Sequence, residues 1–288
     1  MKKFVVFLGG LLFIFLNLSG CGLNNNGNIV GEPSIGISKN NKKVALVIGN
    51  GAYKIEPLTN SANDAHDMAA VLHKVGFDVT LRMNASKATT EKAIKTFQHE
   101  LREDGVGIFY YSGHAIRYEN ENYMIPIGAM EAITTIVQSE KKAISTFKKQ
   151  VVKMENVVTV MEEAKSKLNL VFLDAYRDNP FKSFEKSIAS GWKSGVALTT
   201  NAERILIAYA ASPKKGVENS SGRNSHYTEK LLQFIEKPLP IEFVLKKVRA
   251  AVKKKTDGLQ VPWYITSIEE NFKFVVLTED IPTIISYP

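Results

Sequence analysis

Two apolar stretches of the sequence lead into residues that can do chemistry. Val106–Tyr111 runs into a small-residue turn that carries His114, and Leu168–Ala175 runs into Tyr176 with Asp174 just before it. Each stretch has the length and composition of a buried strand that ends at a polar loop. Loops at the carboxyl ends of strands are where α/β proteins collect ligands and catalytic groups. The pattern therefore predicts that His114 lies close to position 176.

The elements around these two stretches predict an α/β fold. Further apolar runs at 43–50, 77–83 and 204–211 read as strands, whereas 61–75, 89–103 and 147–166 have helical periodicity, and a further helix opens at 222–228. Strands separated by helices in this rhythm indicate a doubly wound, mostly parallel central sheet with helices on both faces.

Composition sets the class of protein. The 288 residues are 44% hydrophobic and 23% charged, which is ordinary for a globular chain, and one domain of about 250 residues is a usual size. The 37 Lys and Arg against 29 Asp and Glu give a net charge of +8. Much of this excess lies in short lysine clusters typical of solvated helix faces, and no nucleic-acid reader motif accompanies it, so we expect no nucleic-acid partner.

The first 21 residues read as a targeting segment. Lys2 and Lys3 precede the apolar run Phe4–Leu18, which is too short to span a membrane comfortably, and Leu18-Ser19-Gly20-Cys21 follows. This ending resembles the bacterial lipobox, whose Cys is lipidated; the alternative is a plain signal peptide with an incidental Cys. We predict a lipoprotein signal peptide at 1–21, a flexible tether at 22–41 and a domain at 42–288, lipid-anchored in a bacterial cell envelope, on the periplasmic face or the cell surface.

Cys21 is the single cysteine of the chain, so the predicted domain contains no thiol. A disulfide, a thiolate metal site and a cysteine nucleophile are thereby excluded from it. His66 and His73 lie seven residues apart without a third ligand in zinc-site spacing. We therefore expect neither a metal nor a cofactor.

Several segments, in order along the chain, resemble the caspase-like cysteine peptidases, the group of caspases, metacaspases and bacterial orthocaspases. They are the His114 and Tyr176 stretches, Ala45-Leu46-Val47-Ile48-Gly49-Asn50 with Tyr53, Asn122-Tyr123-Met124-Ile125-Pro126, Gly222-Arg223-Asn224-Ser225-His226-Tyr227-Thr228, and Gln260-Val261-Pro262-Trp263. The resemblance implies a caspase-like fold with a large-subunit-like half at 42–180 and a small-subunit-like half at 200–288. It also implies that His114 is the catalytic histidine and that Tyr176 stands where the family carries its Cys nucleophile.

A tyrosine cannot replace that cysteine. The mechanism of the family needs a thiolate that attacks the scissile carbonyl and an imidazole that takes up and releases the proton of the thiol. The phenol of Tyr176 has an ordinary pKa of about 10, and its oxygen stands about 4 Å further from the backbone than a Cys sulfur, beyond the tolerance of a catalytic constellation. The sequence thus predicts a pseudopeptidase, without cysteine-protease activity.

Substrate binding is a separate question, because two acids match the positions with which metacaspases bind basic side chains. Asp174 lies two residues before the nucleophile position, and Asp64 belongs to the matching Asn-Asp pair. Structural roles compete with this interpretation: Asp64 fits a capping box with Ser61, and Asp174 can cap its loop or pair with Arg177 or a lysine. The expected partner is a peptide or protein segment with Arg or Lys side chains, and the predicted lipid adds the membrane.

Three functions remain open from the sequence. The first is a lipid-anchored pseudopeptidase that binds basic segments without cutting them. The second is an active hydrolase of the same family with another nucleophile, for which Ser112 and Ser212 are the nearest candidates. The third is an envelope scaffold domain.

Overall fold

The computed structural model describes residues 42–119, 121–135, 140–176, 203–212 and 220–277, together with three two-residue strands. For Tyr176, for 134–135 and 140–144 and for the two-residue strands, this description covers the backbone. Strands β1 (Gly22–Leu23) and β2 (Ile29–Val30) pair antiparallel. The remainder of the predicted signal peptide and tether, with Cys21, lies outside the described residues.

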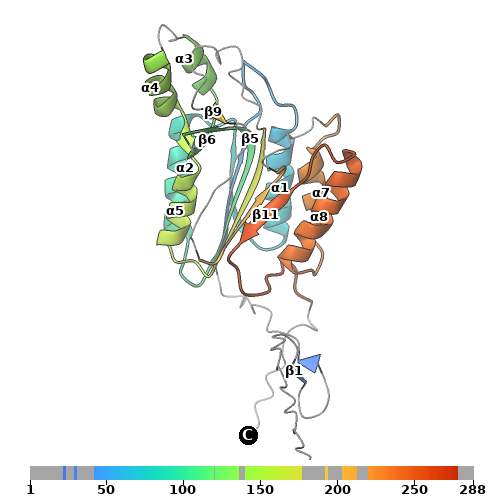
Figure 1. Ribbon diagram of the computed structural model, residues 1–288. Helices are drawn as coiled ribbons and strands as arrows, with labels where there is room; N and C mark the ends of the chain where they lie inside the picture. Colours follow the sequence, from blue (N-terminus) through green and yellow to red (C-terminus); the bar gives the residue numbers. More distant parts are fainter. Residues whose placement is uncertain are drawn as a thin grey trace, which may run out of the picture.

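A twisted sheet forms the centre of the molecule (Figure 1). Its strand order is β11-β10-β8-β5-β3-β4. The strands are β3 (Lys43–Gly49), β4 (Asp78–Met83), β5 (Val106–Tyr118), β8 (Leu168–Tyr176), β10 (Ile205–Tyr209) and β11 (Trp263–Thr266). Every neighbouring pair is parallel except β10 and β11, which are antiparallel. The mostly parallel sheet that the sequence predicts is confirmed.

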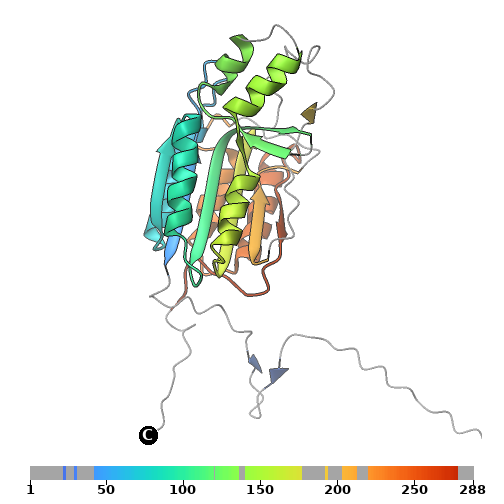
Figure 2. The same ribbon diagram turned by 90° about the vertical axis from the view of Figure 1, so that its left-hand side faces the viewer.

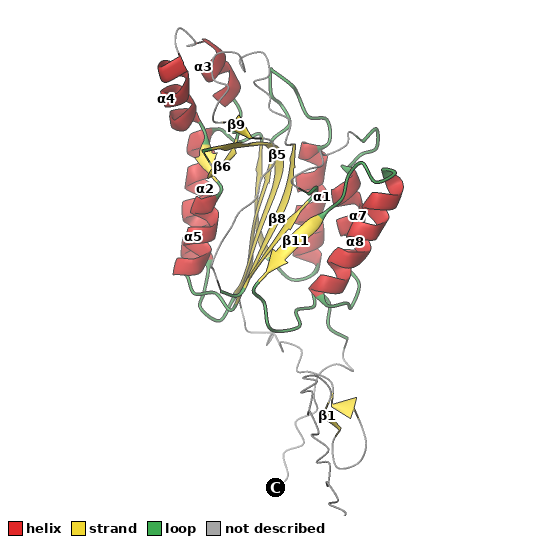
Figure 3. Ribbon diagram, viewed as in Figure 1, coloured by secondary structure: helices red, strands yellow, loops and turns green. Residues whose placement is uncertain are grey.

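Helices cover both faces of the sheet, as predicted (Figures 2 and 3). Helices α2 (Lys87–Glu100) and α5 (Glu155–Glu163) lie on one face, and α1 (Ser61–Lys74), α7 (His226–Ile235) and α8 (Ile241–Lys255) lie on the other. Strand β3 is continuously apolar because its side chains enter both layers: Leu46 and Ile48 join the core on the α2 and α5 side, and Val47 joins the core on the α1 side.

A smaller unit sits beyond the carboxyl ends of the strands. Strand β5 is 13 residues long and continues past its parallel partners to pair antiparallel with β6 (Glu121–Met124) and β9 (Trp192–Lys193), and β6 pairs with β7 (Val152–Lys153). Helices α3 (Ala129–Thr135) and α4 (Glu140–Gln150) lie beside this extension. Tyr118, Tyr123 and Phe147 fill its small core, with edge-to-face ring contacts.

Two element predictions were wrong in extent. A helix over 147–166 was expected, but the chain forms the end of α4, strand β7 and then α5 instead, because Val152 pairs with Met124 of β6. The strand leading to His114 was expected to stop at Tyr111, yet His114 lies within β5. Helix α8 has no counterpart among the predicted elements.

Candidate active site

The register of β5 and β8 brings together the residues that the sequence singled out. Ser112 is the partner of Asp174, and His114 is the partner of Tyr176, in the parallel ladder between the two strands. Neighbouring strands lie about 4.8 Å apart, and residues two positions apart on one strand lie about 7 Å apart on the same face. Position 176 is therefore beside His114, and the Ser112 and Asp174 pair lies one step deeper in the sheet.

The imidazole of His114 is buried, with 4% of the residue exposed. Its Nε2 lies 2.7 Å from the carbonyl oxygen of Glu56, and its ring meets the ring of Tyr53 edge to face at 4.7 Å between centroids. A carbonyl oxygen can only accept, so Nε2 carries the proton. In the neutral ring this leaves Nδ1 as the basic nitrogen, which is the form a general base needs.

Two tyrosine hydroxyls fix the backbone of His114. The His114 N–H donates to Tyr53 Oη at 3.2 Å, and Tyr111 Oη donates to the His114 carbonyl at 2.7 Å. Tyr53 Oη in turn donates to the Ile125 carbonyl at 2.7 Å, and burial raises the pKa of Tyr53 to about 12, so it remains a neutral phenol. The strand segment that carries the imidazole is thus held in one position.

Asp64 and Asp174 meet in the buried layer between the sheet and α7. Each is 1% exposed. Asp64 accepts hydrogen bonds from the Ser225 backbone N–H at 2.9 Å and from Ser112 Oγ at 3.2 Å. Asp174 Oδ2 accepts from Thr228 Oγ1 at 2.7 Å and, through a short contact, from Ser225 Oγ.

Two carboxyl groups this close and this deeply buried do not both ionise at neutral pH. Burial first, and the negative charge of Asp174 second, raise the pKa of the Asp64 carboxyl to about 8. Burial and the same two acids also raise the pKa of Tyr110, whose hydroxyl lies 2.5 Å from Thr228 Oγ1. Asp64 therefore keeps its proton near neutral pH beside Asp174.

The start of α7 completes this cluster. Ser225 is the N-cap of α7, accepting from the Thr228 N–H at 3.0 Å, and the same hydroxyl contacts Asp174. Ser225 and Thr228 belong to a segment that was expected to open a helix and that carries part of the family resemblance, but their hydrogen bonds to the two acids were missed. Their capping pattern of a Ser before a helix was the available signal, but their contact with acids more than 50 residues away depends on the tertiary fold.

The loop before α7 is tied to α1. Asn60 Nδ2 donates to the Gly222 carbonyl at 2.6 Å, and Asn63 Nδ2 donates to the Arg223 carbonyl at 3.1 Å. The Arg223 guanidinium binds both carboxylate oxygens of Asp67 at 2.8 Å, which holds the pKa of Asp67 well below its usual range. This clamp fixes the donors of Ser225 over Asp64.

The capping box predicted for Asp64 is wrong. The N-cap of α1 is Asn60, which makes no side-chain cap, and the Asp64 carboxyl bonds across to Ser225 instead of back to the helix start. Ser112, a candidate alternative nucleophile, is 2% exposed and donates to Asp64, and Ser212 follows β10. Arg177 lies outside the described residues, so its pairing with Asp174 stays a prediction.

The described residues were also searched for metal sites and for membrane-spanning helices. Within the described residues no group of three or more His, Cys, Asp or Glu side chains is arranged to hold a metal ion. Among the helices described, none combines the length and apolar character needed to cross a bilayer.

Comparison with known proteins identifies the family. The sequence model of the caspase domain, a peptidase family, matches residues 42–273, which is most of the chain. The chain belongs to the caspase domain family. The match spans both the His114 strand and the α7 segment, so one family pattern covers every described residue of the candidate site.

Two curated relatives share low sequence identity with part of this chain. The mucosa-associated lymphoid tissue lymphoma translocation protein 1 homolog of Mus musculus is 24% identical over 156 residues, 54% of this chain and 17% of that protein. The Homo sapiens protein is 24% identical over 136 residues, 47% of this chain and 15% of its own length. This chain therefore aligns with less than a fifth of either relative.

A solved structure shares the fold. Protein GSU0716 from Geobacter sulfurreducens superposes with a TM-score of 0.56 at 17% sequence identity, covering 82% of this chain and 99% of that one. At this identity the likeness concerns the architecture of the sheet and its helices.

Proposed function

We propose that this protein is a pseudopeptidase of the caspase domain family that binds basic peptide or protein segments without cutting them, and that it does so from a lipid anchor in a bacterial cell envelope. The observation that carries the proposal is the pairing of His114 with position 176. A family nucleophile belongs beside the imidazole, and the sequence has tyrosine there. No thiolate can form at a tyrosine, so the acyl-transfer step has no nucleophile.

The acid pair supports the binding half of the proposal. Asp174 lies one step deeper than position 176 along β8, a distance comparable to the reach of an extended Lys or Arg side chain. A guanidinium or ammonium that reaches Asp174 and Asp64 can form charge-assisted hydrogen bonds with their carboxyl groups. The chain keeps His114, Asp64 and Asp174 and lacks only the nucleophile. A site that has lost its nucleophile alone is expected to keep its capacity to bind.

Binding to the full-length protein tests the proposal. We expect fluorescently labelled peptides with one Arg to bind by anisotropy, and the same peptides with citrulline, the uncharged isostere, to bind at least tenfold more weakly. Asp174→Asn should abolish this preference for charge. Asp78→Asn is the matched control, because Asp78 is an exposed acid at the start of β4, at the opposite end of the sheet from His114.

Two outcomes would overturn parts of the proposal. Release of product from the Arg peptide by the unmodified protein means that another nucleophile operates and that the domain is an active hydrolase. Equal affinity for Arg and citrulline peptides, or no affinity for either, removes the basic-segment site and leaves an envelope scaffold.

A further inference from the structure

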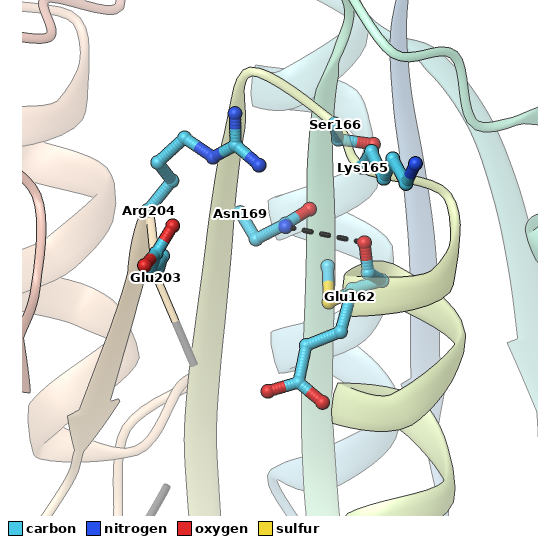
Figure 4. A pocket seen from close by; sticks show the side chains of 7 residues that line it. Glu162, Lys165, Ser166, Asn169, Glu203 and Arg204 are labelled. Carbon is cyan, nitrogen blue, oxygen red and sulfur yellow. Dashed lines mark hydrogen bonds between the residues drawn. The ribbon is translucent and has the colours of Figure 1, made fainter. Parts of the chain in front are cut away.

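The cavity where β8 and β10 begin has a rim of mixed charge (Figure 4). Its charged side chains are Glu162, Lys165, Glu203 and Arg204. Because both signs line the same rim, its charge favours no class of partner. One exposed helix face differs, because its charges are all of one sign.

Helix α8 has a buried face and an exposed face of opposite character. Its buried residues recur every three or four positions and join the core on the α1 side: Ile241, Val244, Leu245, Val248 and Val252. Six exposed residues recur with the same spacing: Phe243, Lys246, Lys247, Ala250, Lys253 and Lys254. With 3.6 residues per turn, these six fall within a sector of about 120° opposite the buried side. They form the outer face of α8, on the outer side of its helix layer (Figure 1).

The four lysines of the outer face are unopposed. None of them forms an ion pair within the described residues, whereas Lys255, at the end of the helix, pairs with Glu229 of α7. Glu242 is the one acid of α8 and is half-buried. Four positive charges thus lie along about 12 Å of helix. Such a cluster attracts an anionic surface.

An exposed aromatic ring belongs to the same face. Phe243 is 54% exposed, and Nζ of Lys246 lies 5.1 Å from the centre of its ring. Lysines alone suit any polyanion, but the ring favours a lipid surface, because there it leaves water for the boundary of the acyl chains. Lysines on a helix face together with an apolar ring are typical of helices that lie on a bilayer.

We propose that the outer face of α8 docks on a bilayer that contains anionic phospholipid. The lysines meet the phosphate groups, and Phe243 enters the region between headgroups and acyl chains. The surface shares no residue with the proposed groove at His114 and Asp174. Docking also requires no lipid anchor, so its success or failure is separate from that of the proposed function.

Partition of the full-length protein into vesicles tests the proposal. Vesicles of phosphatidylcholine alone are compared with vesicles of phosphatidylcholine mixed with phosphatidylglycerol. We expect at least tenfold stronger partition into the anionic vesicles at low salt, and a steep fall of this preference as salt is added. The predicted signal peptide or lipid enters vesicles of both compositions, so the ratio between the two isolates the contribution of charge.

Replacement of all four lysines of the outer face by glutamine should lower this ratio at least fivefold. The matched control replaces four exposed lysines of α2, α4 and the turn after α5 by glutamine: Lys92, Lys95, Lys149 and Lys165. It removes the same charge from the molecule and should keep the preference. Because all eight side chains are exposed or lie on an exposed face, we expect no change in melting temperature.

Phe243→Ser separates a lipid surface from a simple polyanion. It should weaken partition into the anionic vesicles at least threefold, while the dependence on salt stays as in the wild type. Met83→Ser is the control, because Met83 is 43% exposed at the end of β4, the strand at one edge of the sheet. It should change nothing.

The proposal is overturned by any of three results. Equal partition of the wild type into both kinds of vesicle removes the anionic lipid. An equal loss in the control lysine variant means that net charge acts, without a role for α8. Full partition of Phe243→Ser means that the ring does not enter the bilayer and that the lysines meet a polyanion of another class.

Discussion

Asp64 keeps a proton that an exposed aspartate would lose. Its pKa is raised from 3.8 to about 8 by burial and by Asp174, so between these values the folded state binds about one proton more than the unfolded chain. The stability contributed by this proton is fully present below pH 4, falls as the pH rises, and is lost above pH 8. The slope for one proton is about 1.4 kcal/mol per pH unit.

Asp64→Asn should remove this dependence. Asparagine keeps an oxygen for the Ser225 N–H and can donate to Ser112 Oγ, so it imitates the protonated carboxyl. We expect the wild-type free energy of unfolding to fall from pH 5 to pH 8 relative to that of the variant, and the variant to be the more stable above pH 8. Urea titrations at each pH measure the difference; parallel curves would show that Asp64 is ionised.

Sequence reasoning selected His114, Asp64 and Asp174 because each belongs to a recognisable local pattern. It selected the wrong structural role for Asp64, since a Ser three residues earlier fits a capping box in any amphipathic helix start. The hydrogen bonds from Ser225 and Thr228, and the carbonyl of Glu56 at His114, join segments far apart in the chain. Such partners follow from packing, which local patterns do not encode.

At the level of elements, the start of α7 has two tasks, because one serine both caps the helix and holds the acid pair. Ser225→Ala removes the cap and the donor to Asp174 together. We expect a loss of about 2 to 4 kcal/mol in the free energy of unfolding, from one cap and one hydrogen bond to a buried charge.

Ser86→Ala is the matched control for the cap alone. Ser86 caps α2 through the Thr89 N–H at 3.3 Å and is exposed. Its loss should cost about 1 kcal/mol or less. Equal costs for the two serines would mean that the hydroxyl contributes nothing through Asp174.

The elements themselves were largely predictable. Strands β3, β8 and β10 are short, mostly apolar runs, and the fold class followed from the alternation of such runs with helices. The boundaries that failed are those where a small strand interrupts a helical pattern: Val152 and Lys153 form β7 only because β6 offers a free edge. Likewise, β5 extends through His114 because β6 pairs with its continuation from Ala115 onward.

For the whole molecule, the predicted anchor is separable from the domain. If Cys21 is lipidated, Cys21→Ser should lose incorporation of alkyne-palmitate and move from the detergent phase to the aqueous phase on phase separation. The domain should keep its melting temperature. Ser19→Ala, a substitution in the same segment that keeps the cysteine, is the control and should still be labelled; labelling of Cys21→Ser would place the modification elsewhere.

In the proposed function, Tyr176 alone silences a peptidase site that is otherwise in place. The decisive experiment is cleavage of Arg-terminated and Lys-terminated fluorogenic peptides by full-length Tyr176→Cys, beside the wild type and the double variant Tyr176→Cys/His114→Ala. We expect cleavage by Tyr176→Cys only, with a preference for Arg or Lys over citrulline. Cleavage by the wild type, or an equal rate in the double variant, would contradict it, as would a Tyr176→Cys protein that folds normally and cuts nothing.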